Sequence, residues 1–249
     1  MKALVFNGPR DVRYERFPDP ELATDNSVIV KVERCSICGS DLHMYHGDNV
    51  GVANYSEGVE PFCVGHEFAG EVVEVGKSVH RHKVGQKVLA SGGAPCGRCE
   101  HCLSGHTALC KHWTAFGLST RLNGGQAEFV NVPMADLTLQ PIPEGVSDEQ
   151  SILLTDAMCT AYFGLTRTAM EPGDAVAVVG LGPIGLIGVE LAYVLGASKV
   201  YAIDPVANRR AHAANLGAVA LAPSQALPTI MEATKGAGVP RVFEASGAK

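Results

Sequence analysis

The clearest chemistry in this sequence lies in a glycine-rich segment that carries four closely spaced cysteines. Cys96, Cys99, Cys102 and Cys110 form the pattern C-x2-C-x2-C-x7-C within GGAPCGRCEHCLSGHTALC. Four thiolates close together suit a tetrahedral, coordinatively closed zinc site. The segment is too rich in glycine and polar residues to pack a core of its own, so metal binding would supply the missing folding free energy. We therefore predict a structural zinc loop over residues 92–112.

Two other interpretations of this loop are weaker. A pair of disulfides is disfavoured, because three cysteines at a three-residue period are awkward to pair separately. In an acidic chain without a secretion signal, cysteines also serve more often as metal ligands or catalytic groups. His101 and His106 could each replace a thiolate, but the four cysteines leave no vacancy and we expect both histidines to be solvated.

Metal-ligand residue types recur in two further segments, CSICGSDLH at residues 35–43 and GHEFAGEVVEVG at residues 65–76. Each segment alone is weak evidence, since a lone histidine beside a strand is more often a structural residue. Together with the four-cysteine loop they indicate a second metal site. Cys35 and Cys63 receive no role, and a Cys35–Cys38 redox pair lacks the helix-opening context of such motifs.

A third motif, G-x-G-x-x-G at residues 180–185, stands between the apolar run AVAVV and a helical segment. Such glycines let the main chain approach a pyrophosphate, whose charge meets the helix N-terminus. Asp204 closes the next strand, where it would bind the ribose hydroxyls and repel a 2′-phosphate, which favours NAD over NADP. Arg209 and Arg210 leave NADP open, although a solvated helix face explains them more simply. The predicted cofactor contacts are Gly180, Gly182, Pro183, Ile184, Gly185, Asp204 and Arg209.

The elements that must position these residues change character along the chain. Up to residue 132 short β runs alternate with turns, as an irregular β domain does. Examples of these runs are residues 27–34, 71–75, 87–90 and 127–132. Residues 148–168 carry apolar residues at helical spacing. Strands and helices then alternate, which predicts a parallel sheet built by right-handed crossovers. The predicted strands are 175–180, 199–204, 218–222 and 241–245, and the predicted helices are 183–195, 206–216 and one ending near 235.

On these motifs the chain resembles the medium-chain, zinc-dependent alcohol dehydrogenase family. The similarity runs over essentially all 249 residues, from MKALVFNGP through the four-cysteine loop to VVGLGPIG. The resemblance implies an α/β protein with a GroES-like irregular β catalytic domain at residues 1–165. It also implies an incomplete Rossmann-type nucleotide-binding domain at residues 166–249, with a parallel sheet.

The same resemblance implies the ligands of a catalytic zinc, one of two zinc ions with the structural one. Cys38 and His66 occupy the ligand positions of the family's ICGSD-type and GHE motifs. Asp156 corresponds to the Asp of the T-D-x-x-T-x segment found in some bacterial members, although the second threonine falls one residue later here. Cys159 would face nearly the same side of the helix and is the competing third ligand. Three ligands leave a fourth coordination position of the zinc open. In some relatives the glutamate equivalent to Glu67 can occupy that position.

The function that the resemblance implies is hydride transfer between an alcohol, or an aldehyde or ketone, and NAD. Zinc would polarise the alcohol oxygen and lower its pKa. Ser40 and His43 match the family's proton relay to solvent, and Asp41 is either a partner that orients a ligand or a turn cap. The alternative functions are a zinc- and nucleotide-binding module without turnover, and a zinc-free quinone reductase, which the filled zinc motifs disfavour.

Relatives in this family continue beyond the fourth strand of the nucleotide fold, where this chain stops. We therefore expect a C-terminal truncation that removes groups holding the nicotinamide, part of the substrate pocket and the strand edge used for dimers. A homo-oligomer stays possible.

The net charge of −6 disfavours nucleic acid as a partner. Because no signal peptide or membrane span is evident, a cytoplasmic protein acting on a small alcohol or aldehyde is expected.

Overall fold

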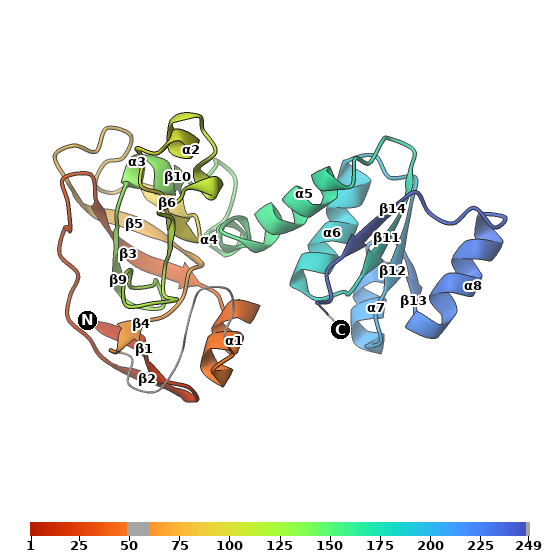
Figure 1. The fold of residues 1–249 in the computed structure, drawn as a ribbon, viewed down its shortest axis with the longest axis horizontal. Coiled ribbons are helices and arrows are strands. Elements are labelled where there is room, and N and C mark those ends of the chain that lie inside the picture. Colours follow the sequence, from red (N-terminus) through yellow and green to blue (C-terminus); the bar gives the residue numbers. More distant parts are fainter. Residues whose placement is uncertain (49–59, 248–249) are drawn as a thin grey trace. The chain divides into compact units, whose positions relative to one another are not determined.

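The computed structural model describes residues 1–48 and 60–247, which belong to two compact units (Figure 1). The first unit is Met1–Asp156 and the second is Ala157–Lys249. This division falls earlier than the boundary expected near residue 165. The reason is that helix α5 packs against a helix of the second unit and contributes two side chains to its core.

The first unit is built from antiparallel strands. Its sheets have the strand orders β10-β6-β5-β3-β9, β2-β1-β4 and β7-β8. The strands are β1 (Lys2–Gly8), β2 (Asp11–Arg16), β3 (Val28–Cys35), β4 (Phe62–Cys63), β5 (Phe68–Val75), β6 (Lys87–Ala90), β7 (Gly93–Ala94), β8 (Thr114–Ala115), β9 (Phe129–Val132) and β10 (Leu139–Pro141). Strands β3, β5, β6 and β9 correspond to the four runs expected from the sequence.

Short helices connect these strands. They are α1 (Gly39–His46), α2 (Glu100–Leu103), η1 (Thr107–Leu109), α3 (Ala135–Thr138), α4 (Asp148–Ser151) and η2 (Ile152–Leu154). The core of the large sheet is formed by alternate apolar residues of its strands, including Val28 and Val30 of β3 and Phe68 and Val72 of β5. Burial of such side chains is the main favourable term in folding. It sets the β3–β5 register, which includes irregularities near Val30 and Val32.

The helical spacing expected over residues 148–168 corresponds to three helices rather than one continuous helix. The chain forms α4, then the 3-10 helix η2, and then α5 (Ala157–Arg167) after a break at residues 155–156. A capping box at Ser147 and Gln150 starts α4. The hydroxyl of Thr155 donates to the carbonyl oxygen of Ile152 at 2.7 Å, within the tighter turn. The break sets Asp156 at the end of the first unit.

The second unit is a parallel sheet with strand order β13-β12-β11-β14, which is the 3-2-1-4 part of a Rossmann-type sheet. Alternate residues of β11 and β12 face two separate cores, one beneath α5, α6 and α7 and the other beneath α8. This is how a doubly wound α/β sheet is covered. Its other elements are β11 (Ala175–Val179), α6 (Pro183–Val194), β12 (Lys199–Ile203), α7 (Ala207–Asn215), β13 (Val219–Leu221), α8 (Pro223–Ala233) and β14 (Arg241–Glu244).

The expected α/β fold class is confirmed. Within the described part of the chain, no helix combines the length and the apolar character needed to cross a membrane.

Candidate functional site

Four side chains of the first unit converge in one cluster: Cys38, His66, Glu67 and Asp156. Their ligand atoms all lie within 4.8 Å of one another. Cys38 is the N-cap residue of α1, His66 and Glu67 directly precede β5, and Asp156 follows η2. Zinc binds sulfur, nitrogen and oxygen at about 2.0 to 2.3 Å, which puts tetrahedral ligands about 3.3 to 3.8 Å apart. The cluster therefore has the size and the donor types of a zinc site.

The histidine of this cluster lies between two carboxylates. Its Nε2 is 3.6 Å from Asp156 Oδ2, and its Nδ1 is 3.6 Å from Asp41 Oδ1. Desolvation lowers the pKa of His66, but the Cys38 thiol and the carboxylates of Asp41 and Asp156 outweigh it and raise that pKa. Burial raises the pKa of the Asp41 carboxyl. Acidic groups gathered around one imidazole fit a divalent cation, whose charge would offset their mutual repulsion.

Asp41 has the place of a group that orients a metal ligand. Its Oδ2 accepts the main-chain N–H of Cys38 at 2.9 Å. Its Oδ1 and the Nδ1 of His66 are both buried, have no hydrogen-bond partner among the residues that the structure describes, and face each other. A proton on Nδ1 would join them and leave the lone pair of Nε2 toward the cluster. The Asp41 carboxylate therefore makes the turn cap, and its other oxygen lies where a group that orients His66 would stand.

The expected relay residues lie on α1. Ser40 donates its hydroxyl to Cys38 Sγ at 3.3 Å, which puts it beside the cluster. His43 is exposed and its Nδ1 lies 3.1 Å from Asp48 Oδ2. A hydroxyl at the site and an imidazole in solvent are the two ends that a proton relay requires.

Two residues of this region were not predicted as site residues. The hydroxyl of Ser36 donates to the Glu67 carboxylate, and the Ser36 N–H donates to the Glu67 carbonyl oxygen at 3.2 Å. Gln126 donates its amide to the Ser36 carbonyl oxygen at 2.9 Å. Ser36 stands inside the CSICGSDLH segment and could have been considered. Gln126 is ninety residues away in sequence, and no pattern marks it.

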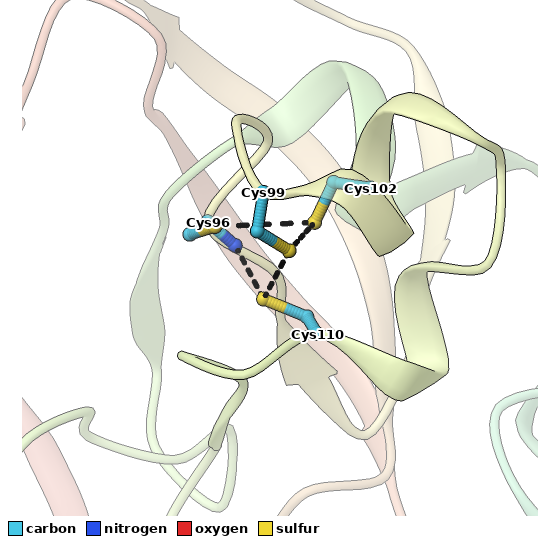
Figure 2. A group of neighbouring side chains, drawn as sticks. All are labelled: Cys96, Cys99, Cys102 and Cys110. Carbon is cyan, nitrogen blue, oxygen red and sulfur yellow. Dashed lines mark hydrogen bonds between the residues drawn. The ribbon is translucent and has the colours of Figure 1, made fainter.

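The second candidate metal site is the four-cysteine loop (Figure 2). The Sγ atoms of Cys99 and Cys102 are 3.5 Å apart, those of Cys99 and Cys110 3.9 Å, and those of Cys96 and Cys102 4.0 Å. Zn–S bonds of about 2.3 Å in a tetrahedron put sulfur atoms about 3.8 Å apart. A disulfide needs about 2.0 Å, and all four are free thiols. The loop therefore fits a closed zinc site.

Main-chain amides support the anionic form of these thiols. Cys110 Sγ accepts the N–H groups of Cys96 at 3.2 Å and of His112 at 3.3 Å. A hydrogen bond from the main chain of Cys102 lowers the pKa of Cys99 to about 6. Burial raises the pKa of Cys102 to about 11. A bound cation would be needed to hold all four as thiolates at neutral pH.

The histidines of the loop lie apart from its sulfur group. His106 Nδ1 is 3.2 Å from the Ser104 hydroxyl, and His101 Nε2 is 3.6 Å from Glu100. The ligand group that the structure forms here consists of the four cysteines.

In the second unit, the glycine motif forms the turn between β11 and α6. Gly180 has φ +85°, and a Cβ there would lie 2.6 Å from the main chain of Ser246. Gly182 is the N-cap of α6, with open space where a Cβ would stand, and Pro183 and Ile184 follow as its first residues. A Cβ on Gly185 would lie 1.8 Å from the Gly180 carbonyl oxygen. The motif therefore combines a tight turn, an open approach to a helix N-terminus and close helix–strand packing.

Asp204 directly follows β12, and its side chain is 2% exposed. Its carboxylate accepts the N–H groups of Leu181 at 2.8 Å and of Val206 at 2.7 Å. Burial would raise its pKa, but these two bonds and Arg209, 3.6 Å away, lower it overall. Arg210 donates to the Asp204 carbonyl oxygen at 2.8 Å, so it is not simply a solvated side chain. A carboxylate has about four acceptor positions, so Asp204 could still accept ribose hydroxyls.

Comparisons with known proteins agree with this fold. The alcohol dehydrogenase GroES-like domain matches residues 24–144, and the zinc-binding dehydrogenase domain matches residues 183–249. A Mycobacterium tuberculosis protein described as "Probable zinc-binding alcohol dehydrogenase" is 39% identical over 247 residues, which are 99% of this chain and 62% of that protein. The sorbitol dehydrogenase of Bacillus subtilis is 34% identical over 250 residues, with 99% and 69% covered.

A solved structure, the alcohol dehydrogenase TADH from Thermus sp. ATN1, has a TM-score of 0.91 at 36% identity. The match covers 100% of this chain and 71% of the Thermus protein's chain. The two units define a zinc-type medium-chain dehydrogenase architecture. The chain belongs to the zinc-dependent alcohol dehydrogenase family, and it spans 62% of the length of the mycobacterial relative.

Proposed function

We propose that this chain carries the zinc and nucleotide sites of an oxidoreductase that transfers a hydride between an alcohol, or an aldehyde or ketone, and NAD. The observation that carries this proposal is the convergence of Cys38, His66, Glu67 and Asp156 on one small volume. These residues come from three segments far apart in sequence, and the set combines thiolate, imidazole and carboxylate donors that suit zinc. Membership in the family supports an oxidoreductase.

In this proposal Cys38, His66 and Asp156 hold the ion, and the nearby Glu67 is available for the fourth position. Zinc bound there would polarise the alcohol oxygen and lower the pKa of its hydroxyl. The hydroxyl of Ser40, beside Cys38, would accept the proton that the alcohol loses while it passes its own proton on, through the ribose of the bound cofactor, toward His43. His43, which is exposed, would release it to solvent.

For the nucleotide, we propose NAD. The N-terminus of α6 and the open space at Gly182 suit a pyrophosphate. The Asp204 carboxylate, with its lowered pKa, would repel a 2′-phosphate. Arg209 beside it partly offsets this repulsion. Among solved structures similar to this chain, one from Escherichia coli was determined with NADH and one from Sinorhizobium meliloti with NADP.

The test combines metal analysis with NADH formation on a panel of primary and secondary alcohols. We expect about two zinc ions per chain, one closed and one open site. Cys38→Ser should lose the open-site zinc and any turnover. Cys35→Ser is the matched control, since Cys35 is exposed and lies outside the cluster. A zinc-free chain would refute the proposal. Two zinc ions and nucleotide binding without turnover would instead support a non-catalytic binding module.

The third ligand is tested by a second matched pair of variants. Asp156→Asn should weaken binding at the open site, because Asp156 belongs to the cluster. Cys159→Ser, three residues further on, should leave zinc content unchanged. The reverse outcome would assign the third ligand to Cys159.

A further inference from the structure

Gln126 occupies a buried position beside the metal-ligand cluster. Its main-chain N–H donates to the Val64 carbonyl oxygen at 2.9 Å, and its own carbonyl accepts from Leu4 at 2.8 Å. Its side chain lies across Gly65, where a Cβ would come within 2.4 Å of Gln126 Cγ. Gly65 has φ +96°, a conformation that favours glycine. Gln126 is therefore rigidly held against the residue that precedes His66.

The side-chain amide of Gln126 connects the two segments that supply the ligands. Nε2 donates to the Ser36 carbonyl oxygen at 2.9 Å and lies 3.5 Å from Asp41 Oδ2. Ser36 in turn holds Glu67 through its hydroxyl and its N–H. Asp41 faces His66 with its other oxygen. The buried amide of Gln126 thus contacts Ser36, which holds Glu67, and Asp41, which faces His66.

We propose that Gln126 is a positioning residue for the metal centre, an inference that rests on the proposed function. Together with the N–H of Cys38, its amide keeps Asp41 Oδ2 engaged, so that Oδ1 stays turned toward His66 Nδ1. The imidazole then presents Nε2 to the ion. Partners one step removed from the ligands commonly change metal affinity by about 10- to 100-fold when they are replaced.

The experiment compares zinc affinity in the intact chain and in Gln126→Met, which keeps the length of the side chain but removes both donors. Zinc transfer to a chromogenic chelator is followed for each site. The absorption spectrum of cobalt bound at the open site reports its ligand geometry. We expect about 10- to 100-fold weaker zinc binding at the open site, an altered cobalt spectrum and no change at the four-cysteine site. The matched control is Gln140→Met, since Gln140 is an exposed glutamine of the same unit.

Open-site affinity within about twofold of the unaltered chain would overturn the inference, and so would an equal loss at both zinc sites. Should the Met variant fail to fold, Gln126→Glu replaces it, because it keeps the packing against Gly65 but turns an oxygen toward Asp41 and Ser36. The same loss at the open site alone is expected. Absence of zinc from the open site of the unaltered chain would refute the proposed function itself. Normal binding there, unaffected by either variant, would refute only the role of Gln126.

Discussion

Replacing Gly185 by alanine should destabilise the second unit and weaken nucleotide binding. The new Cβ would stand 1.8 Å from the Gly180 carbonyl oxygen, whereas real Cβ atoms essentially never come within 3.0 Å of another atom. The carbonyl must therefore move by about 1.2 Å, the difference of these distances. It belongs to the same peptide group as the Leu181 N–H, which donates to the buried Asp204 carboxylate at 2.8 Å. The substitution thus combines overpacking with the loss of a charged hydrogen bond.

The size of the effect follows from these two costs. Overpacking of a close contact typically costs about 1 to 3 kcal/mol, and a hydrogen bond to a charged group contributes about 1.5 to 3 kcal/mol. Partial relaxation makes the sum smaller, so we expect about 2 to 4 kcal/mol. Hydrogen exchange measured by mass spectrometry reports this locally, in peptides covering β11 and β12. Since each 1.4 kcal/mol is about tenfold, protection there should fall by at least about 30-fold.

Gly182→Ala is the matched control, because a Cβ at Gly182 meets no atom within 4 Å. Exchange in β11 and β12 should change little. AMP affinity, measured by calorimetry, should nevertheless fall, since the methyl group would stand where a phosphate approaches the start of α6. Unchanged protection in Gly185→Ala, or AMP binding by Gly182→Ala equal to that of the unaltered chain, would refute the assigned roles of these glycines.

Three further predictions concern single residues. Cys110→Ser should reduce zinc from about two ions to about one and make residues 92–112 sensitive to proteases, whereas Cys35→Ser should do neither; equal zinc content in both would contradict the closed site. Asp174 has a pKa lowered by the Glu171 N–H and by Arg241, so its contribution to stability is present above about pH 4 and lost as pH falls. Asp174→Asn should therefore lower the melting temperature at pH 7, with the difference shrinking as the pH falls below about 4; a constant difference would count against the ion pair. Asp204→Ala should lower the preference for NAD over NADP in binding assays and cost about 1 to 3 kcal/mol of stability; an unchanged cofactor ratio would remove Asp204 from the nucleotide site.

The sequence by itself determined the features whose chemistry is local. The four cysteines lie within fifteen positions of the chain, and a loop of that length can bring them together with little help from the rest of the fold. The glycine motif needs only the strand before it and the helix after it. The alternation of strands and helices predicted the parallel sheet, because parallel neighbours need crossover connections. Its strand order followed from the family resemblance.

The tertiary structure alone decided how the cluster around His66 is supported. Gln126 reaches Ser36 and Asp41 only because residues 124–126 pair with residues 63–65, and that pairing joins segments about sixty positions apart. The break at residues 155–156 likewise depends on where α5 finds its core, since Ala161 and Leu165 belong to the core of the second unit. Periodicity describes one element at a time. Sequence motifs can therefore name candidate ligands of this site, but not the hydrogen bonds between strands and loops that hold those side chains in place.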